Sequence, residues 1–302
     1  MKILVLGNGL IATATAAIAA VGTNSVALAS RSDKVSDVGL ARHGVELFRS
    51  NPEFFWSDAQ IMAGNSEVVI SALGVSSPAL AESHPEKYFN EAREIIENLN
   101  QMAHTNPGLR LFVVTSGGTV YGETPREGAP EEFPKNPVSH YGLHNSHIED
   151  FLLSSPVGLE GRVCCLRVSN PYGVSQTGVQ SRSFVDAALA SALSGTPLTI
   201  LGDGEHVRDF IHIEDAATLI ARSIESQDAP PPVLNIGTGI GHSLNEVTEM
   251  IEHRTGRLIG IHHEARRTFD VHVNVLDSRK AFSLAGFHPR LLEDGLGANG
   301  VM

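Results

Sequence analysis

The first twenty or so residues constrain the fold more strongly than any other stretch. Residues 2–6 form a continuous apolar run, the pattern of a strand buried on both faces of a parallel sheet. Gly7-x-Gly9-x-x-Ala12 follows, and the alanine-rich residues after it predict a helix from about residue 11 to 21. The first glycine permits a tight turn, the second lets backbone approach a phosphate, and Ala12 allows close packing of helix on strand. This unit predicts a pyrophosphate at the helix N-terminus; the alternative is a tight turn without a ligand.

Composition and charge narrow the classes of partner. The chain has 302 residues, 42% of them hydrophobic, and a formal net charge of -12 without a run of Lys or Arg. An acidic chain of this kind argues against nucleic acid or an anionic membrane as a partner. Cys164 and Cys165 would point to opposite faces of one strand, which argues against a disulfide or a metal pair. We expect a cytoplasmic protein without a transmembrane helix; in the alternative, the first residues are a secretion signal, which Gly7 and Gly9 would interrupt.

Strand and helix patterns alternate through the first half of the chain. Further strands are predicted at residues 25–29, 45–48, 67–73, 111–116 and 161–168, with helical periodicity between several of them. This alternation predicts an α/β fold with a doubly wound parallel sheet, and ligands at the carboxyl ends of its strands. We expect one domain from residues 1–169, with 205–237 returning to the sheet, and a smaller substrate lobe from 170–204 and 238–302.

The end of the second predicted strand bears on the choice of dinucleotide. Ser30 and Arg31 stand where NAD enzymes usually place an acidic residue that binds the ribose 2′-hydroxyl. An arginine there suits a 2′-phosphate, and no carboxylate precedes Asp33. The sequence therefore favours NADP over NAD; the alternative is that Arg31 is a solvated surface charge.

Residues 116–122 (SGGTVYG) and 140–145 (HYGLHN) resemble the active-site segments of the extended short-chain dehydrogenase/reductases, in particular the NAD-dependent epimerase/dehydratase family of nucleotide-sugar enzymes. The resemblance implies a Rossmann fold and makes Tyr141 the proton-transferring residue. The usual hydroxyl position is Gly117 here, so we expect Thr119 first and Ser116 second to polarise the substrate oxygen. Asn145 replaces the usual lysine; it can hydrogen-bond the ribose, but it carries no charge to lower the pKa of Tyr141.

The same resemblance implies further ligand contacts. It places Asn170, in Asn-Pro-Tyr-Gly, and Arg208, in Arg-Asp-Phe-Ile-His, at the substrate diphosphate, together with Arg267 and Asp270. A guanidinium fits phosphate oxygens bidentately. The alternatives are a turn role for Asn170 and a salt bridge from Arg208 to Asp209 or Asp215. The predicted cofactor-binding residues are Gly7, Gly9, Leu10, Ile11, Ala12, Ser30, Arg31, Ala72, Leu73, Gly74, Tyr141 and Asn145.

Three histidines surround Tyr141 on the predicted helix. His144 is the nearest candidate for a replacement cation, with His140 and His147 close by. The spacing could be drawn as a metal site, but exposed helix histidines explain it better, and we expect no metal.

These observations lead to three hypotheses for the function. The first is an NADP-dependent ketoreductase that acts on a nucleotide-diphosphate sugar. The alternatives are a nucleotide-sugar 4-epimerase with bound NAD, and a binding protein that keeps both pockets but has lost efficient chemistry. Asn145 and Gly117, with Arg93 and Glu94 in place of a usual Gly-Thr pair, favour the last. The resemblance also implies a homodimer formed through residues 86–103 and 141–154.

Overall fold

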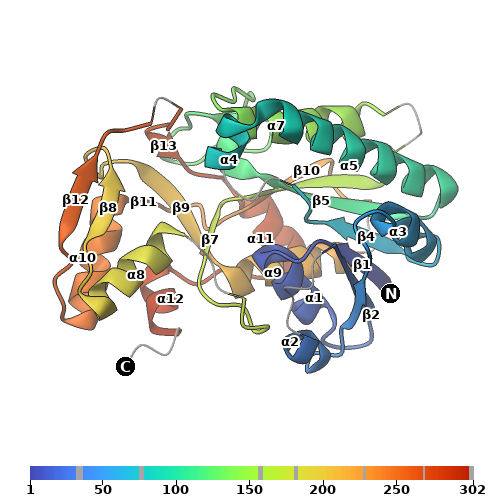
Figure 1. The fold of residues 1–302 in the computed structure, drawn as a ribbon, viewed down its shortest axis with the longest axis horizontal. Helices are drawn as coiled ribbons and strands as arrows, with labels where there is room; N and C mark the ends of the chain where they lie inside the picture. Colours follow the sequence, from blue (N-terminus) through green and yellow to red (C-terminus); the bar gives the residue numbers. More distant parts are fainter. Residues whose placement is uncertain are drawn as a thin grey trace.

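The computed structural model describes residues 1–31, 37–74, 78–155, 159–179, 183–226, 229–267 and 269–298. Its larger part is a seven-stranded parallel sheet in the order β10-β6-β5-β4-β1-β2-β3 (Figure 1). The chain builds outward from β1 in one direction, then returns to β4 and builds in the other, which confirms the predicted doubly wound Rossmann sheet. The strands are β1 (Lys2–Leu6), β2 (Ser25–Ser30), β3 (Glu46–Arg49), β4 (Val68–Ser71), β5 (Arg110–Ser116), β6 (Val163–Val168) and β10 (Val233–Ile236).

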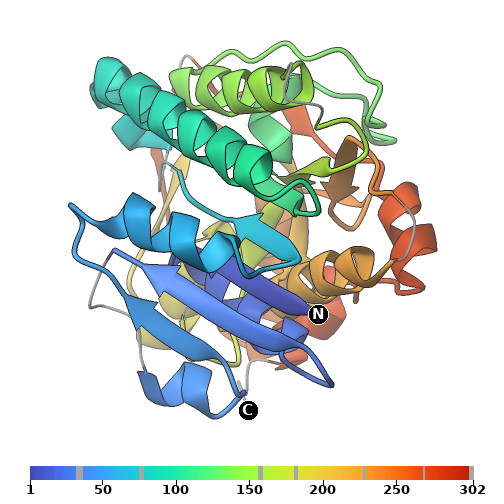
Figure 2. The same ribbon diagram turned by 90° about the vertical axis from the view of Figure 1, so that its right-hand side faces the viewer.

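Two layers of helices cover the two faces of this sheet (Figures 1 and 2). Successive side chains of a strand point to opposite faces, so Ile3 and Val5 pack with α1 and α9, whereas Leu4 and Leu6 pack with α3 and α5. Both faces of the central strands are therefore buried, as their continuous apolar runs predict. The helices of this part are α1 (Leu10–Ala19), α2 (Asp37–Ala41), α3 (Phe55–Ala63), α4 (Pro78–Ser83), α5 (Pro85–Thr105), α6 (Gly117–Tyr121), α7 (His140–Leu153), α9 (Ile213–Glu225) and α11 (Arg279–Ala285).

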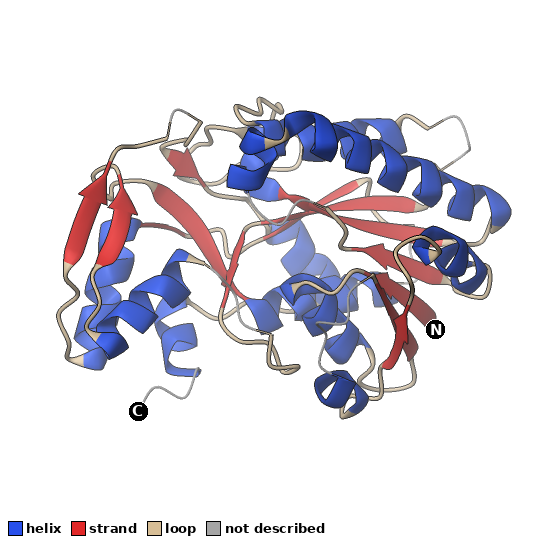
Figure 3. Ribbon diagram, viewed as in Figure 1, coloured by secondary structure: helices blue, strands red, loops and turns tan. Residues whose placement is uncertain are grey.

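A smaller part lies beside the sheet, at the left of Figure 3. It holds a four-stranded sheet, in which β9 pairs with β7, β11 and β13, and a two-stranded pair of β8 and β12. Its own apolar core includes Tyr172, Phe210 and Ile251. The elements are β7 (Asn170–Tyr172), α8 (Phe184–Ser194), β8 (Leu198–Leu201), β9 (Val207–His212), β11 (Gly241–Ser243), α10 (Leu244–Thr255), β12 (Ile261–Glu264), β13 (Val273–Asn274) and α12 (Leu292–Ala298).

The structure departs from two local expectations. Residues 117–122 are rich in glycine, a composition that favours a loop, but they contain the short helix α6, which packs on α7. Within 205–237, α9 packs on the large sheet and β10 joins it, but β9 belongs to the smaller sheet, because its pairing partners β7, β11 and β13 lie there. Across the described ranges, no helix combines the length and the apolar character needed to span a membrane.

Candidate active site

The ends of the central strands bring the expected functional segments to one edge. The adjacent strands β6, β5, β4 and β1 all run in the same direction, so the residues that follow them meet at their carboxyl ends. Gly7 follows β1, Ala72 to Gly74 follow β4, and Ser116 ends β5. This edge is where an open α/β sheet binds its ligands.

The turn after β1 is shaped to receive a phosphate. Gly7 has φ +117°, and a Cβ there would lie 2.8 Å from the carbonyl oxygen of Ala72, so only glycine fits. Gly9 caps α1 without a side-chain hydrogen bond, and a Cβ at Gly9 would meet nothing within 4 Å. Open space therefore lies before the N-terminus of α1, where the amides of Leu10, Ile11 and Ala12 begin the helix. These features fit the pyrophosphate of a dinucleotide.

The end of β2 holds Arg31 beside a carboxylate. Ser30 is buried, and Arg31 is partly exposed. The Arg31 Nη2 lies 3.4 Å from Glu91 Oε1 on α5, and the guanidinium lies 5.4 Å from the centre of the Phe55 ring. Arg31 is thus anchored by a carboxylate and an aromatic ring, and it is not the freely solvated charge of the alternative interpretation.

Tyr141 stands in the first turn of α7. The Ser139 hydroxyl caps this helix by accepting from Gly142 N at 3.0 Å. A side chain at Gly142 would collide with the backbone of Thr119, so the glycine allows α6 and α7 to approach closely. Burial raises the pKa of Tyr141, while hydrogen bonding with Asn145 and Ser116 acts in the opposite direction. The phenol therefore has two neutral polar neighbours, and burial sets the direction of its pKa shift.

The structure distinguishes the candidate hydroxyls. Hydrogen bonding with Ser116 is among the effects that act to lower the pKa of the Tyr141 phenol. The Thr119 hydroxyl instead donates to the Ser116 carbonyl, with the two oxygens 3.5 Å apart. The geometry therefore favours Ser116 over Thr119, the reverse of the expected order; both roles stay predictions. The Asn145 Nδ2 donates to the Tyr141 carbonyl oxygen at 2.8 Å, which turns its amide toward its own helix turn.

The three histidines differ in their surroundings. His140 and His147 are exposed, as expected, but His144 is buried with 4% of its surface exposed. Burial lowers the pKa of His144, so the ring is neutral at pH 7 and does not supply a standing positive charge. Within the parts of the chain that the structure describes, no group of three or more His, Cys, Asp or Glu side chains is arranged to hold a metal ion.

The predicted substrate residues lie in or beside the smaller sheet. The Asn170 Nδ2 donates to Asp209 O at 2.9 Å. Arg208 donates to the carbonyl oxygens of residues 207, 271 and 272, which holds β9 against the segment that leads to β13. Asp270 N donates to Arg267 O at 3.3 Å. Arg208, Arg267 and Asp270 therefore lie in neighbouring backbone segments, and their contacts with a substrate stay predictions.

Neither Asp209 nor Asp215 forms the salt bridge with Arg208 that was the alternative interpretation. Asp209 accepts from Thr238 and Gly239, and Asp215 pairs with Arg290, whose Nη2 lies 2.8 Å from Asp215 Oδ1. The guanidinium of Arg208 is therefore held by backbone carbonyl oxygens and not by either aspartate.

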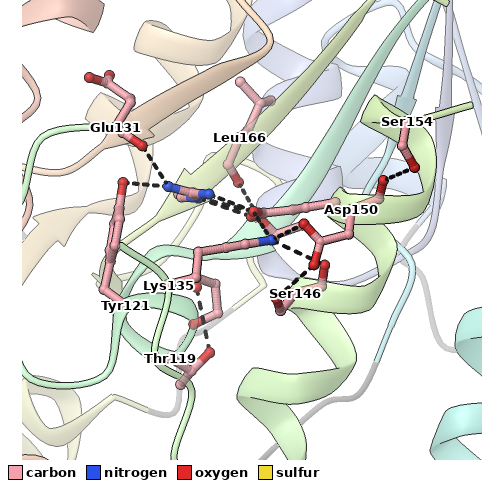
Figure 4. A network of polar contacts seen from close by, with 12 residues as sticks. Thr119, Tyr121, Glu131, Lys135, Ser146, Asp150, Ser154 and Leu166 are labelled. Atoms are coloured by element: carbon pink, nitrogen blue, oxygen red, sulfur yellow. Dashed lines mark hydrogen bonds and ion pairs between the residues drawn. The ribbon is translucent and has the colours of Figure 1, made fainter. Parts of the chain in front are cut away.

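A buried ionic network behind the active site was missed by sequence reasoning (Figure 4). Arg167 Nη2 lies 2.6 Å from Glu149 Oε2, and its Nη1 donates to the Tyr121 hydroxyl at 2.6 Å. Thr115 donates to Glu149 at 2.8 Å, and Lys135 lies 3.7 Å from the same carboxylate. The network joins β5, β6 and α7. The signal in the sequence was a glutamate four residues after Asn145, on the same helix face.

Lys135 is not a substitute for the missing lysine. Its ammonium group contacts Glu149, Asp150 and the Ser146 carbonyl, beyond Asn145 along α7. It is not among the groups that shift the pKa of Tyr141. Tyr141 is therefore set among neutral partners.

Comparison with known proteins agrees with this geometry. The model of the NAD dependent epimerase/dehydratase family matches residues 3–237. A Methanocaldococcus jannaschii protein, whose name proposes a UDP-glucose 4-epimerase, is 31% identical over 62% of this chain and 60% of its own length. The dTDP-4-dehydro-6-deoxyglucose reductase of Escherichia coli is 28% identical over 62% and 59%, respectively. The matches thus span less than two thirds of these two relatives.

Solved structures support the fold over the whole length. The UDP-glucose 4-epimerase of Bifidobacterium longum, in complex with NAD+ and UDP, superposes with a TM-score of 0.85 at 23% identity, and the match covers 100% of this chain and 97% of that one. The Thermotoga maritima UDP-glucose 4-epimerase gives 0.82 at 24% identity, with 98% and 96% covered. The predicted family and fold are both confirmed: the chain belongs to the NAD dependent epimerase/dehydratase family.

Proposed function

We propose that this protein is a nucleotide-sugar 4-epimerase that retains NAD. The observation that carries this proposal is the position of Tyr141 and Ser116 at the same sheet edge as the phosphate-binding turn. The names of several relatives agree, among them the UDP-glucose 4-epimerase of Dictyostelium discoideum, which is 28% identical over 74% of this chain and 70% of its own. The structural neighbours from Bifidobacterium longum and Thermotoga maritima hold UDP or UDP-glucose, which favours a UDP-sugar as substrate.

The cofactor in this proposal is NAD, in place of the NADP favoured by the sequence. Arg31 suggested a partner for a 2′-phosphate, but its guanidinium lies 3.4 Å from Glu91. The Glu91 carboxylate pairs with the Arg31 guanidinium and would repel the 2′-phosphate of NADP. A carboxylate is compatible with the ribose 2′-hydroxyl of NAD. Several structural neighbours hold NAD, including the Thermus thermophilus enzyme at 23% identity.

The residues of the chain define the chemical roles. NAD, when bound, supplies a reversible oxidant for the sugar carbon. The N-terminus of α1 binds its pyrophosphate. Tyr141 accepts the proton of the sugar hydroxyl during oxidation and returns it during reduction, and Ser116 hydrogen-bonds the same oxygen. In this proposal Asn170, Arg208, Arg267 and Asp270 bind the substrate diphosphate, so that the sugar alone turns between the two half-reactions.

The test is to release and identify the cofactor and to assay epimerisation. Protein purified without added nucleotide is denatured, and the supernatant is assayed for NAD(H) and NADP(H) separately. The native protein is then incubated with UDP-glucose and UDP-galactose, and the products are separated by chromatography. We expect about one equivalent of NAD(H) per chain. We also expect interconversion of UDP-glucose and UDP-galactose, or of another pair of nucleotide sugars that differ at the same carbon. Absence of dinucleotide binding, or bound NAD with no turnover of any UDP- or dTDP-sugar, would contradict the proposal.

A ketoreductase remains the second candidate. The reductase name of the Escherichia coli relative favours it. Net oxidation of NADPH by a 4-keto nucleotide sugar, without retained NAD, would support this reaction over epimerisation. The binding-protein hypothesis predicts that both ligands bind but nothing turns over.

We also propose that the chain forms a homodimer through α5 and α7. Large apolar side chains are exposed on these helices and on α4, and a pocket of about 500 Å³ lies between them. The exposed side chains are Leu80, Phe89, Leu143, Phe151 and Leu153. An exposed apolar surface of this kind is typical of an interface.

The two functional parts expected from the sequence, and the cytoplasmic location, stay predictions.

A further inference from the structure

His144 is a buried side chain at this edge of the sheet that neither the family resemblance nor the proposed chemistry uses. It lies on α7, one turn after Tyr141, and only 4% of its surface is exposed. Both ring nitrogens are buried, and neither makes a well-formed hydrogen bond within the described residues. A buried imidazole without a well-formed hydrogen bond is destabilising, so a side chain of this kind points to a ligand.

The surroundings of His144 define what that ligand must offer. Burial lowers the pKa of the ring, and the positive charge that His147 can carry acts in the same direction. Weak hydrogen bonding to the Tyr88 backbone and the charge of the Glu91 carboxylate, both on α5, raise the pKa but do not reverse the effect of burial. The ring is therefore neutral, with one nitrogen that donates and one that accepts. Such a ring pairs with hydroxyl or amide groups.

The direction of the ring places that ligand at the sheet edge. The Nε2 of His144 lies 3.9 Å from the position that a Cβ on Gly74 would take. Gly74 follows β4, and two residues earlier the Ala72 carbonyl packs against Gly7 of the phosphate-binding turn. The imidazole thus reaches the edge on the β4 side of that turn. Asn145, by contrast, uses its amide on the carbonyl of Tyr141.

The strand order identifies which half of a dinucleotide lies there. The pyrophosphate belongs at the end of β1, and the adenosine ribose belongs at the end of β2, on one side of β1. β4 and β5 lie on the other side of β1. The other half of the dinucleotide, which carries the nicotinamide, therefore lies over the ends of β4 and β5, between His144 and Ser116.

We propose that His144 is a cofactor-binding residue, whose imidazole hydrogen-bonds the nicotinamide half of the dinucleotide in place of the lysine that Asn145 replaces. This inference rests on the proposed function, because it requires a dinucleotide at the sheet edge. The contact is neutral, so it holds the cofactor without adding a positive charge beside Tyr141. His144 would thus position the cofactor, as the usual lysine does, but it would not lower the pKa of Tyr141.

The experiment compares two ligands on four variants. NADH contains both halves of the dinucleotide, and ADP contains only the adenosine diphosphate half. Affinities for both are measured by titration on protein freed of nucleotide, for the wild type, His144→Leu, His144→Met and His144→Gln. The matched control is His147→Gln, which changes an exposed histidine on the same helix. Thermal unfolding of each nucleotide-free variant is recorded in parallel.

We expect His144→Leu to bind NADH about five- to tenfold more weakly, as loss of one or two hydrogen bonds predicts, with unchanged affinity for ADP. The same substitution raises the unfolding midpoint of the nucleotide-free protein, because it removes buried polar groups that lack partners. His144→Gln restores most of the NADH affinity, since its amide both donates and accepts. His147→Gln leaves both affinities unchanged.

Three results would overturn the inference. Equal losses of NADH and ADP affinity would show that His144 only supports the fold, and unchanged NADH affinity would show that its ring does not face the cofactor. A change of oligomeric state with unchanged NADH affinity would assign the ring to the pocket between α5 and α7, which it also lines. If His144→Leu does not fold, His144→Met, with a more adaptable apolar side chain, decides by the same criteria. Failure of the wild type to bind NADH would instead refute the proposed function.

Discussion

At the scale of single residues, the setting of Tyr141 is the main departure from the pattern that the sequence resembles. Burial raises the pKa of its phenol, and the groups that oppose this shift, Asn145 and Ser116, are neutral. A phenol in this environment is a competent proton donor at pH 7, but it is rarely ionised to accept a proton. Under the proposed function we therefore expect the oxidation half-reaction to be the slow step.

The pH dependence of turnover tests this account. The base is the ionised phenol, so a raised pKa moves the rising limb of the rate profile to higher pH. We expect the wild-type rate of sugar oxidation to keep rising with pH through the alkaline range. Asn145→Lys places a cation one turn from Tyr141, lowers the pKa of the phenol, and moves the limb to lower pH. The rate at neutral pH should then rise, by about tenfold if the limb moves by one pH unit.

The control for this prediction is Asn145→Met, which lengthens the side chain without charge. Its profile should keep the position of the wild-type limb. If Asn145→Lys and wild type show superimposable profiles, the phenol is not the base. Loss of activity in Asn145→Lys alone would mean that the site has adapted to a neutral residue at this position.

At the scale of elements, α7 is held on the sheet by the buried pair of Arg167 and Glu149. The Glu149 side chain is fully buried and the Arg167 side chain is 4% exposed. Truncation of one partner leaves the other as an unpaired buried charge, whereas replacement of both by apolar groups leaves none. The pair therefore fixes the position of Tyr141 two turns earlier on the same helix.

We expect Glu149→Ala to lower the free energy of unfolding by about 3 to 5 kcal/mol in urea titrations. The double substitution Glu149→Leu with Arg167→Met should recover most of this loss. The matched control is Glu97→Ala, because Arg93 and Glu97 form an ion pair with both side chains about two thirds exposed; such a pair contributes about 0.3 to 0.5 kcal/mol. A loss in Glu149→Ala no larger than that in Glu97→Ala would contradict the assigned role of the network.

At the scale of the whole molecule, the exposed apolar side chains of α4, α5 and α7 bear on assembly. Phe151 is 52% exposed on α7, and Leu143 is 45% exposed on the same helix. We expect the wild type to sediment as a dimer and Phe151→Glu to sediment as a monomer, because a buried carboxylate without a partner opposes association. Leu258→Glu, at an 88% exposed leucine in the smaller part, should remain dimeric. A monomeric wild type would refute the homodimer.

Much of the architecture could be predicted because its signals are local. The apolar run of residues 2–6 and the glycine turn predicted β1 and α1 closely. Ser243 and Gly256 are residue types that commonly begin and end a helix, and at the two ends of α10 they form a capping box and a left-handed C-cap. The short helix α6 was missed, because glycines favour loops and its course depends on packing: a Cβ at Gly117 would lie 2.5 Å from the Leu276 side chain.

The sequence alone determined the strand-turn-helix unit, the doubly wound sheet, the family, and Tyr141 with a neutral Asn145 one turn later. Each of these is written in neighbouring residues, whose spacing and chemistry act through local backbone geometry. Only the tertiary structure decided that Glu91 would meet Arg31 from 60 residues away, that Ser116 rather than Thr119 would approach the phenol, and that His144 would be buried beside Gly74. These contacts join segments far apart in the chain, so they exist only once the helices have packed on the sheet.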